Sequence, residues 1–432
     1  MTKLPVIKKP HGLPILPGND ANGQSITLGV MGGGQLGRMF VHAAQAMGYA
    51  TAVLDPDVTS PAGLVSHLHV RSDYLDAKGL NTLAQSCAAV TTEFENVPAH
   101  ALQTLAGTVP VAPAASAVRI AQDRAQEKAH FGRCGVPCAP YAVIETAEQL
   151  AAADAYLLPG VLKTSRMGYD GKGQIRVKNR AELAVAWDSL KNVPCVLEKM
   201  LALKSECSVI VARGWDGECV NLPVQLNMHH EGILAVTEVF GGNLPASLVK
   251  KAIAAAKSIA HELKYVGVLC VEFFVLEEGS ADRKALGGLI VNEIAPRPHN
   301  SGHYSMNACD VSQFELQVRT LAGLPLAPPR QHSPAIMLNL LGDLWFVKAK
   351  SGKASIPTVP PQLEASPMTP PWAKVLALPG THLHLYGKAK PSRGRKMGHL
   401  NITGRTVAEV RATASQAAKL LGIKPFYKKV GQ

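Results

Sequence analysis

The stretch that most limits the fold lies near the N-terminus, where an apolar strand runs into a glycine turn and a helix. Residues 26–31 have the apolar run of a buried strand, residues 32–37 have the spacing G-x-G-x-x-G, and residues 36–47 follow with helical periodicity. Residues 50–54 and 89–94 are the next apolar strands. This order predicts parallel strands with helical crossovers, which is the start of a doubly wound sheet.

The glycine turn leaves three possibilities open. Glycines at these positions let the backbone approach an anion, and the first amides of the helix favour a phosphate. Asp55 ends the second strand, where dinucleotide-binding folds place the carboxylate that binds a ribose. A nicotinamide dinucleotide, another phosphorylated ligand, and a tight turn without a ligand are all compatible with this pattern.

Composition indicates a globular protein. The 432 residues are 47% hydrophobic and 18% charged, with a net charge of +12. No apolar run approaches the ~20 residues of a membrane span, and residues 1–25 lack the apolar centre of a signal peptide. Eight scattered cysteines are too few for a disulfide scaffold, so we expect reduced, mostly buried thiols. These features predict a cytoplasmic protein that does not enter a membrane.

Changes in pattern along the chain predict four segments. Residues 1–25 form a loose leader, residues 26–135 the parallel domain, residues 136–205 a small block, and residues 206–432 a larger part with longer, hairpin-like strands. In that last part we expect a strand at residues 335–341 and an amphipathic helix at residues 407–421.

A second glycine cluster, at residues 168–174, lies between two predicted strands of the small block. It lacks the G-K-[S/T] and the following helix of a Walker loop. Together with Lys163 and Lys172, such a segment suits a mobile lid that wraps a triphosphate with amides and ammonium groups. An ordinary flexible turn remains the alternative.

A pair of glutamates gives the most specific physical signal. A hairpin of residues 268–276 and 288–295, joined by a polar loop, places Glu272 opposite Glu293. Carboxylates opposed at about 5 Å repel, so one pKa rises unless a cation intervenes. Two carboxylates with phosphate oxygens form the ligand set that Mg²⁺ prefers. If the register is off by one, one of the two glutamates faces solvent.

Two polar segments complete the set. Residues 292–303 carry Arg, Asn, Ser and two His after the second glutamate strand, a density typical of a binding loop. Residues 388–396 are basic, and they fit a phosphate pocket, a solvated face or a minor-groove clamp. Aromatic residues make up only 5% of the chain, which disfavours nucleic acid as a partner.

Taken together, these motifs resemble those of the ATP-grasp enzymes. Within them, the chain is most similar to the 5-(carboxyamino)imidazole ribonucleotide synthases of purine biosynthesis, from about residue 26 to about residue 400. The motifs that carry the resemblance are G-G-G-Q-L-G-R at 32–38, T-E-F-E-N-V-P at 92–98, Q-D-R at 122–124, G-Y-D-G-K-G-Q at 168–174, residues 292–303, and G-R-K-M-G-H at 394–399.

The resemblance implies a fold that is α/β overall and α+β in the grasp part. It implies a Rossmann-like N-terminal domain at 26–135, an ATP-grasp lid at 136–205, and an antiparallel C-terminal domain at 206–432 that includes the basic phosphate-binding segment.

The resemblance also implies which residues bind ATP. Arg124 and Lys163 contact phosphates, the 168–174 loop closes over them, and the segment from Glu198 to Leu201 reads adenine. Glu272 and Glu293 hold two Mg²⁺ ions, for which Mn²⁺ is a possible substitute. The implied ATP-binding residues are Arg124, Lys163, Gly168, Tyr169, Asp170, Gly171, Lys172, Gly173, Gln174, Glu198, Lys199, Met200, Leu201, Glu206, His229, Asn292 and Glu293.

The remaining roles concern the ribonucleotide and the chemistry. The implied substrate-binding residues are Gly34, Gln35, Leu36, Glu95, Asn300, Ser301, Lys388, Arg395 and Lys396. The implied catalytic residues are Asp170, Lys172, Arg297 and His303. Because Lys390 and Arg393 lie between Lys388 and Arg395, which cation holds the 5′-phosphate is left open.

The implied reaction uses ATP and bicarbonate to carboxylate the 5-amino group of aminoimidazole ribonucleotide through carboxyphosphate, in a homodimer. A sibling ATP-grasp ligase or transformylase that activates another carboxylate is the nearest alternative. A nicotinamide-dependent dehydrogenase explains only the first glycine turn and Asp55, and it leaves the glutamate pair without a role.

Overall fold

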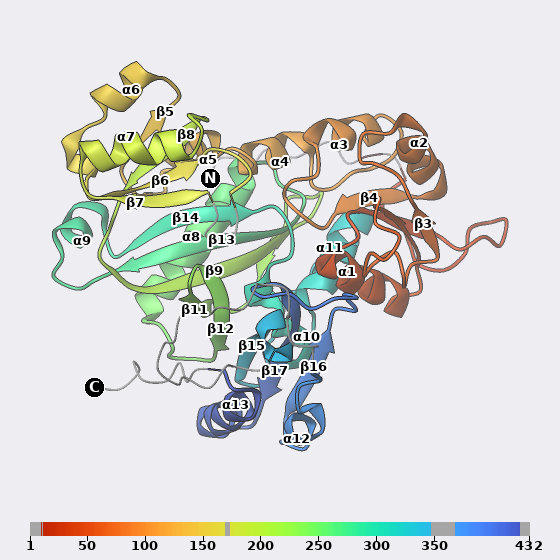
Figure 1. The fold of residues 1–432 in the computed structure, drawn as a ribbon. Coiled ribbons are helices and arrows are strands. Elements are labelled where there is room, and N and C mark those ends of the chain that lie inside the picture. Colours follow the sequence, from red (N-terminus) through yellow and green to blue (C-terminus); the bar gives the residue numbers. More distant parts are fainter. Residues whose placement is uncertain (1–9, 11, 169–172, 347–367, 424–432) are drawn as a thin grey trace, which may run out of the picture.

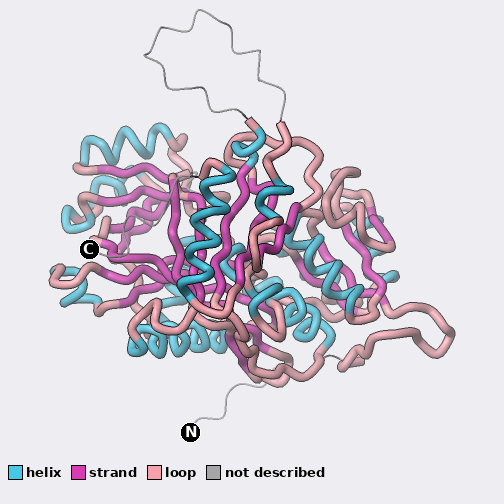
Figure 2. Tube along the Cα trace, turned by 90° about the horizontal axis from the view of Figure 1, so that it is seen from below, coloured by secondary structure: helices cyan, strands magenta, loops and turns pink. Residues whose placement is uncertain are grey.

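The structure, a computed structural model, describes residues 10, 12–168, 173–346 and 368–423. Its strands form three sheets, one in each part that Figure 1 shows as a separate lobe or layer. A parallel sheet forms the N-terminal lobe. A small sheet lies within residues 141–199, a part called the lid below after its predicted role. A large sheet extends through the body to the last strands of the chain. In Figure 2 these last strands run side by side within the body, and helices lie on the outside.

The N-terminal sheet is parallel and has the order β3-β2-β1-β4. Alternate residues of β1 face opposite sides, so Val30 packs with α1 while Met31 packs with α2. With helices on both faces, the sheet is doubly wound as predicted. Its elements are β1 (Thr27–Met31), α1 (Gln35–Ala46), β2 (Ala50–Leu54), β3 (Leu68–Val70), α2 (Ala77–Ser86), β4 (Ala89–Thr92), α3 (Ala99–Leu105), α4 (Ala115–Ala121) and α5 (Arg124–Arg133).

The lid is a four-stranded antiparallel sheet with the order β5-β8-β6-β7. One face is closed by an apolar cluster that includes Leu162, Leu183 and Trp187. The other face carries Lys163 and Glu198 toward the large sheet. The elements are β5 (Tyr141–Ile144), α6 (Ala147–Ala152), η1 (Ala155–Leu157), β6 (Gly160–Thr164), β7 (Gln174–Val177), α7 (Arg180–Ser189) and β8 (Cys195–Lys199).

The large sheet has nine strands in the order β14-β13-β9-β11-β12-β15-β17-β16, with β10 paired to β9. Helix α8 (Ala246–Glu262) covers one face of β9 and β13 with its apolar stripe. The strands are β9 (Leu203–Arg213), β10 (Cys219–Asn221), β11 (Gln225–His230), β12 (Ile233–Val239), β13 (Gly267–Leu276), β14 (Leu289–Ala295), β15 (Ala335–Leu341), β16 (Thr381–Leu385) and β17 (Lys396–Thr403).

Helices connect this sheet to the N-terminal lobe and complete its far end. Helix α11 packs against α1, and α13 covers β15 and β17. The predicted strand at 335–341 and helix at 407–421 are confirmed with those bounds. The remaining helices are η2 (Asn300–Gly302), α10 (Ser305–Ala308), α11 (Gln313–Ala322), η3 (Gly342–Trp345), α12 (Trp372–Leu376) and α13 (Val407–Leu421).

One predicted loop contains a helix. The segment between β13 and β14, expected to be a polar loop, contains the short helix α9 (Ala281–Leu286). The Ser280 hydroxyl caps it by accepting a hydrogen bond from the Arg283 amide, and Gly287 ends it with a positive φ of 88°. Six residues are too few to show helical apolar periodicity, so only the two caps signalled this helix.

The first described residues pack against the body. Ile15 is buried, its amide donates to the Ala322 carbonyl, and its carbonyl accepts from the Tyr49 hydroxyl. The segment predicted as a loose leader is therefore fixed at Ile15. The boundary at residue 25 stays a prediction.

All eight cysteines lie among the described residues and are free thiols, buried or partly buried. This agrees with the expected reduced state. None of the helices that the structure describes is long and apolar enough to cross a membrane.

Candidate active site

The predicted glutamate pair is present in the β13–β14 hairpin. Glu272 lies opposite Glu293 in the antiparallel register, which confirms the predicted pairing. The register shifts immediately afterwards, because Phe273 pairs with Val291 and leaves Asn292 as an extra residue. A β-bulge of this kind re-aims side chains and is common beside active sites.

Each carboxylate has its own cationic partner. The distance from Glu272 Oε1 to His299 Nε2 is 2.9 Å, and Arg124 Nη1 lies 3.0 Å from Glu293 Oε2. Burial opposes ionisation of Glu272, but the charge of His299 and its hydrogen bond outweigh burial and lower the pKa of Glu272 to about 2. For Glu272, a basic partner therefore gives a lowered pKa in place of the raised pKa expected of an unpaired carboxylate.

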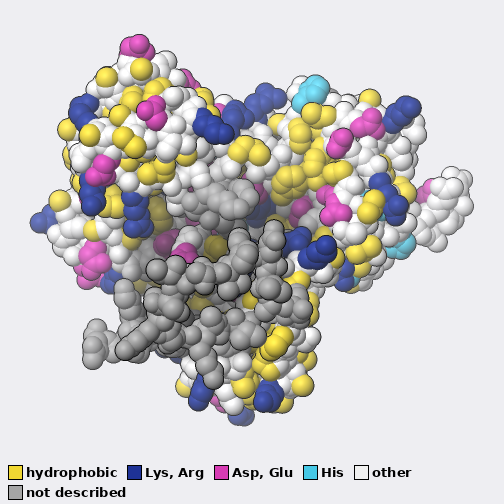
Figure 3. Space-filling view, viewed as in Figure 1, with side chains coloured by type: hydrophobic (Ala, Val, Ile, Leu, Met, Phe, Trp, Pro, Cys, Tyr) yellow, Lys and Arg dark blue, Asp and Glu magenta, His cyan; other side chains and the backbone are white. Residues whose placement is uncertain are grey.

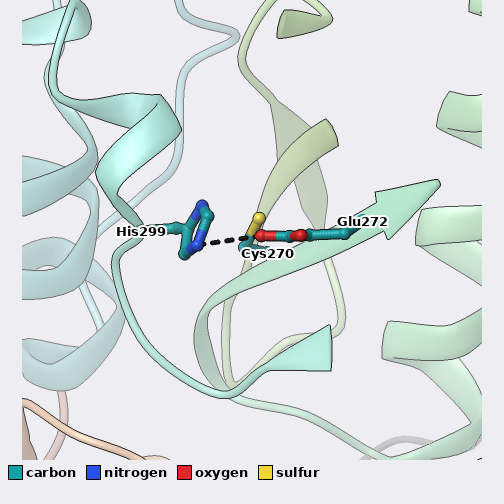
Figure 4. A group of neighbouring side chains, drawn as sticks. All are labelled: Cys270, Glu272 and His299. Carbon is teal, nitrogen blue, oxygen red and sulfur yellow. Dashed lines mark ion pairs between the residues drawn. The ribbon is translucent and has the colours of Figure 1, made fainter. Parts of the chain in front are cut away.

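Cys270 lies next to this pair, and Figure 4 shows its sulfur beside the Glu272–His299 contact. One ligand atom each from Cys270, Glu272 and His299 lie within 4.8 Å of one another. Burial raises the pKa of the Cys270 thiol, so it stays protonated and is a poor metal ligand.

Oxygen donors for a hard cation are nevertheless available. Asn292 Oδ1 is buried and has no hydrogen-bond partner among the described residues. The bulge leaves Asn292 unpaired in the register, directly before Glu293, which lies opposite Glu272. Two carboxylates and a carbonyl oxygen without a partner are the donors that Mg²⁺ prefers, so these residues fit that ion.

A buried triad of charges lies on the lid side of the site. Glu198 makes ion pairs with Lys128 at 3.0 Å and with Lys163 at 2.9 Å, and its side chain is 4% exposed. Burial disfavours the charged carboxylate, yet the two lysines lower the pKa of Glu198 to about 2. The sequence analysis missed Lys128. It lies one turn after Arg124 on α5, and this i, i+4 spacing is the signal that could have revealed it.

Glu206 and His229 come together on the neighbouring strands β9 and β11, with Glu206 Oε2 3.0 Å from His229 Nδ1. Burial lowers the pKa of His229, but the hydrogen bond to Glu206 and the charges of Glu206, Glu272 and Glu293 raise it overall. These four side chains therefore share one electrostatic environment.

The second glycine cluster is described only at its ends. Lys163 pairs with Gln174, which confirms the hairpin between β6 and β7, and the Thr164 amide donates to the Gly173 carbonyl. Gly168 is the last described residue before the gap. Four of the predicted ATP-binding residues, of which Asp170 and Lys172 were also predicted to be catalytic, lie outside the described residues: Tyr169, Asp170, Gly171 and Lys172.

The segment after β14 joins the N-terminal lobe to the large sheet. Arg297 makes an ion pair with Glu95, and this arginine lowers the pKa of Glu95 to about 2 against the effect of burial. Asn300 is buried, and neither atom of its amide group has a hydrogen-bond partner among the described residues. Ser301 accepts a hydrogen bond from Ser208 at 2.8 Å. The Asn300 amide is thus available to a ligand.

His303 lies in a buried group of rings. It packs near Phe314 and lies 4.6 Å from His399, centroid to centroid, and the Gln313 amide donates to its Nδ1 at 2.9 Å. Burial is the first cause that lowers the pKa of His303 well below its usual value. His303 is thus neutral and surrounded by rings, and its implied catalytic role stays a prediction.

The first glycine turn differs from its expected role. The amides of Gly34 and Gly37 donate to the two Glu93 oxygens at 3.0 and 3.1 Å, and the Gly33 amide donates to Asp55 at 2.7 Å. The amides expected to be free for a phosphate are therefore bound to carboxylates of the chain itself. Asp55 also accepts from Tyr74, which removes the basis for a dinucleotide site.

Two other residues of this turn were predicted to bind substrate. Gln35 begins α1, and Leu36 packs with Phe314 and Tyr386.

The basic segment lies against this same region. A Cβ at Gly387 would be 3.0 Å from Arg38 Nη1 of α1. The pKa of Asp57 is lowered mainly by hydrogen bonds from Thr59, and the charge of Arg395 adds to this effect. Lys388 Nζ donates to the Lys396 carbonyl at 2.7 Å. The structure thus brings cations from two distant parts of the sequence together. Figure 3 shows Lys and Arg spread among acidic and apolar side chains elsewhere on the visible face, without one broad basic stripe.

Three family comparisons match successive parts of the chain. Residues 25–122 match the ribonucleotide synthetase preATP-grasp domain, and residues 129–314 match the ATP-grasp domain. Residues 335–413 match the phosphoribosylaminoimidazole carboxylase C-terminal domain. The predicted segment 206–432 therefore contains the end of the second match and all of the third.

Curated relatives match nearly the full length. An N5-carboxyaminoimidazole ribonucleotide synthase of Brucella melitensis is 39% identical over 385 residues, covering 88% of this chain and 97% of the relative. The same enzyme of Bacillus subtilis is 37% identical over 376 residues, covering 87% and 90%.

Solved structures agree. An ADP complex of an N5-carboxyaminoimidazole ribonucleotide synthetase has a TM-score of 0.80 at 37% identity, covering 95% of this chain and 97% of that one. The Aspergillus clavatus enzyme, in complex with ADP and 5-aminoimidazole ribonucleotide, has a TM-score of 0.78 at 30% identity, covering 92% and 99%. With this coverage, identity and shared fold, the chain belongs to the ATP-grasp family of N5-carboxyaminoimidazole ribonucleotide synthases.

Proposed function

We propose that this protein is the ATP-dependent ligase that carboxylates the 5-amino group of 5-aminoimidazole ribonucleotide in purine biosynthesis. ATP and bicarbonate are consumed, and ADP, phosphate and N5-carboxyaminoimidazole ribonucleotide are released. The observation that carries the proposal is the paired Glu272 and Glu293, each with a cationic partner, in a fold whose solved relative is described as a complex with ADP and 5-aminoimidazole ribonucleotide.

The first step transfers the γ-phosphoryl group of ATP to a bicarbonate oxygen, which gives carboxyphosphate and ADP. This step needs no covalent nucleophile from the chain, because phosphoryl transfer depends on positioning and charge neutralisation. Arg124 and Lys163 would bind phosphate oxygens, and in support each holds a carboxylate that a phosphate can replace. Glu206, beside His229, would bind the ribose hydroxyls.

A divalent cation completes the ATP site. Glu272, Glu293 and the Asn292 carbonyl oxygen are the residues that would hold Mg²⁺, or Mn²⁺ in its place. When bound, the ion neutralises charge on the transferring phosphoryl group. Arg124 and His299 hold the two carboxylates in position before the ion binds.

The second step forms a C–N bond. The 5-amino nitrogen attacks the carboxyl carbon of carboxyphosphate, or CO₂ released from it, and phosphate leaves as the nitrogen loses a proton. Asn300 and Arg297 lie at the junction where this acceptor would sit, and the cations of residues 388–396 with Arg38 would hold the 5′-phosphate. The glycine turn would shape the pocket without binding the phosphate, because its amides already have partners.

Isotope transfer tests this reaction directly. With ¹⁸O-labelled bicarbonate, Mg²⁺, ATP and the ribonucleotide, the proposal predicts one ¹⁸O atom in each phosphate released. Unlabelled phosphate would contradict attack by bicarbonate. Activity with formate but not with bicarbonate would assign the chain to the transformylase branch instead.

Two further expectations rest on the family resemblance. We infer a homodimer in the cytoplasm, and light scattering of the purified protein tests the dimer. A monomeric mass at micromolar concentration would contradict it.

A further inference from the structure

A contact outside the phosphate and metal groups joins the predicted adenine-reading segment to α9. This segment, residues 198–201, begins at the end of β8. Successive side chains of a strand point to opposite faces. Glu198 therefore points into the site toward Lys163, while Lys199 points away from it.

The Lys199 ammonium is held by two groups. Its Nζ lies 2.7 Å from Asp282 Oδ1 and 4.0 Å from the centre of the Tyr156 ring. The side chains of Lys199 and Asp282 are only 17% and 15% exposed, so water screens this pair weakly. The hydrogen bond to Asp282 raises the pKa of Lys199, so its charge persists at neutral pH.

These two groups belong to different parts of the protein. Tyr156 lies in η1 of the lid, and Asp282 lies in the first turn of α9, beyond the tip of the β13 strand that carries Glu272. Lys199 thus links the lid to the hairpin that holds the two glutamates. A groove of about 620 Å³ lies between the same two parts, with Leu157 of η1 and Leu286 of α9 in its walls.

The backbone of residues 199 and 200 is held by two hydrogen bonds within the lid. The Lys199 amide donates to the Pro140 carbonyl, and the Met200 amide donates to the Pro159 carbonyl, both at 2.9 Å. The Met200 amide is thus already bonded within the lid. The Lys199 side chain adds a contact from this segment to α9.

We propose that Lys199 is a positioning residue for adenine, and that its contacts with Asp282 and Tyr156 fix the 198–201 backbone so that it selects adenine over other bases. This proposal rests on the proposed function, because it assumes that residues 198–201 read the base. It assigns the Lys199 side chain a role that requires no contact with the nucleotide.

The chain offers a matched control. Lys204 of β9 and Glu278, which follows β13, form an ion pair of the same 2.7 Å length, but their side chains are 50% and 68% exposed. Exposed ion pairs of this kind contribute little to the stability of a protein. The variant Lys204→Met therefore removes the same charge without removing the partly buried contact.

The experiment measures binding of ADP and GDP by calorimetry in the presence of Mg²⁺, without ribonucleotide or bicarbonate. We expect Lys199→Met and Asp282→Asn each to weaken ADP binding about fivefold or more, and to reduce the preference for ADP over GDP. Lys199→Arg retains the charge and should keep most of the preference, and Lys204→Met should stay within twofold of wild type.

A second measurement separates positioning from general damage. In the complete reaction, Lys199→Met should raise the KM for ATP while kcat and the KM for the ribonucleotide change less than twofold. Parallel changes in all three constants, or equal effects of Lys204→Met, would overturn the positioning role. If the wild-type protein and the Lys199→Met variant bind ADP equally well, the positioning role of Lys199 alone is overturned. Wild-type protein that binds no ADP would overturn the proposed function as well.

Discussion

Two regions of this protein carry the same kinds of groups but use them differently. At the ATP side, Glu198, Glu272 and Glu293 are each paired with cationic side chains, which a phosphate or a metal ion can exchange for new partners. At the glycine turn, Glu93 and Asp55 are bound to backbone amides, which have no mobility to exchange. The comparison teaches that a glycine turn before a helix binds an anion only when the chain leaves its amides unbonded.

The largest expected effect comes from the metal pair. We predict that Glu293→Gln reduces ATP turnover by about 100-fold or more, because it removes an ionised oxygen ligand and leaves the Arg124 charge without its partner. Release of ADP measures the effect, and circular dichroism checks that the variant is folded. Full activity in a folded variant would remove the metal assignment.

The charged triad gives the next effect. The folded pKa of Glu198 is lowered from 4.5 to about 2, so its contribution to stability is complete above about 4.5 and is lost as pH falls toward 2. This pKa shift corresponds to about 3 kcal/mol of the free energy of unfolding. In urea titrations between pH 5 and pH 2.5, Glu198→Gln should flatten the decrease in the free energy of unfolding. An unchanged slope would contradict the triad's role in stability.

A substitution at the glycine turn should lower the stability of the protein and leave nucleotide binding unchanged. Removing the carboxylate in Glu93→Ala leaves two amides without their partner, which costs about 2 kcal/mol of unfolding free energy. Binding of ADP should stay within twofold of wild type. If Glu93→Ala instead lowers the affinity for ADP strongly and leaves stability unchanged, the glycine turn binds the nucleotide. That result would contradict the difference drawn between the two regions.

The smallest effect concerns the ribonucleotide phosphate. We predict that Lys396→Ala raises the KM for the ribonucleotide about tenfold, because one cation of the basic segment is lost. The KM for ATP should change less than twofold. Steady-state kinetics with each substrate varied in turn measures both constants, and equal changes in the two would contradict the phosphate-pocket role.

Much of the fold could be predicted from the sequence, because apolar periodicity is strong in long elements. The strand Ala335–Leu341 and the helix Val407–Leu421 were predicted with their bounds, and the Glu272–Glu293 register followed from two strands and one loop. Helix α9 was missed because short helices depend on caps and local propensity, which a polar loop also contains.

The partners of the site residues were harder to predict. Nothing local in the sequence shows that Glu198 lies beside Lys128, or Glu95 beside Arg297, because these pairs join parts of the chain that are far apart. The glutamate at position 93 lies within a motif noted from the sequence, but its bonds to the glycine turn depend on how two parallel strands end side by side. Tertiary contacts of this kind decide whether a charged residue binds a ligand or its own chain.

The most direct test of the central claim is release of ADP in the presence of Mg²⁺, ATP and bicarbonate, measured with and without 5-aminoimidazole ribonucleotide. The proposed function predicts strong stimulation by the ribonucleotide that depends on bicarbonate. Binding of ATP without any such stimulation would contradict it and would leave the protein as an ATP-grasp ligase for another carboxylate and another amine.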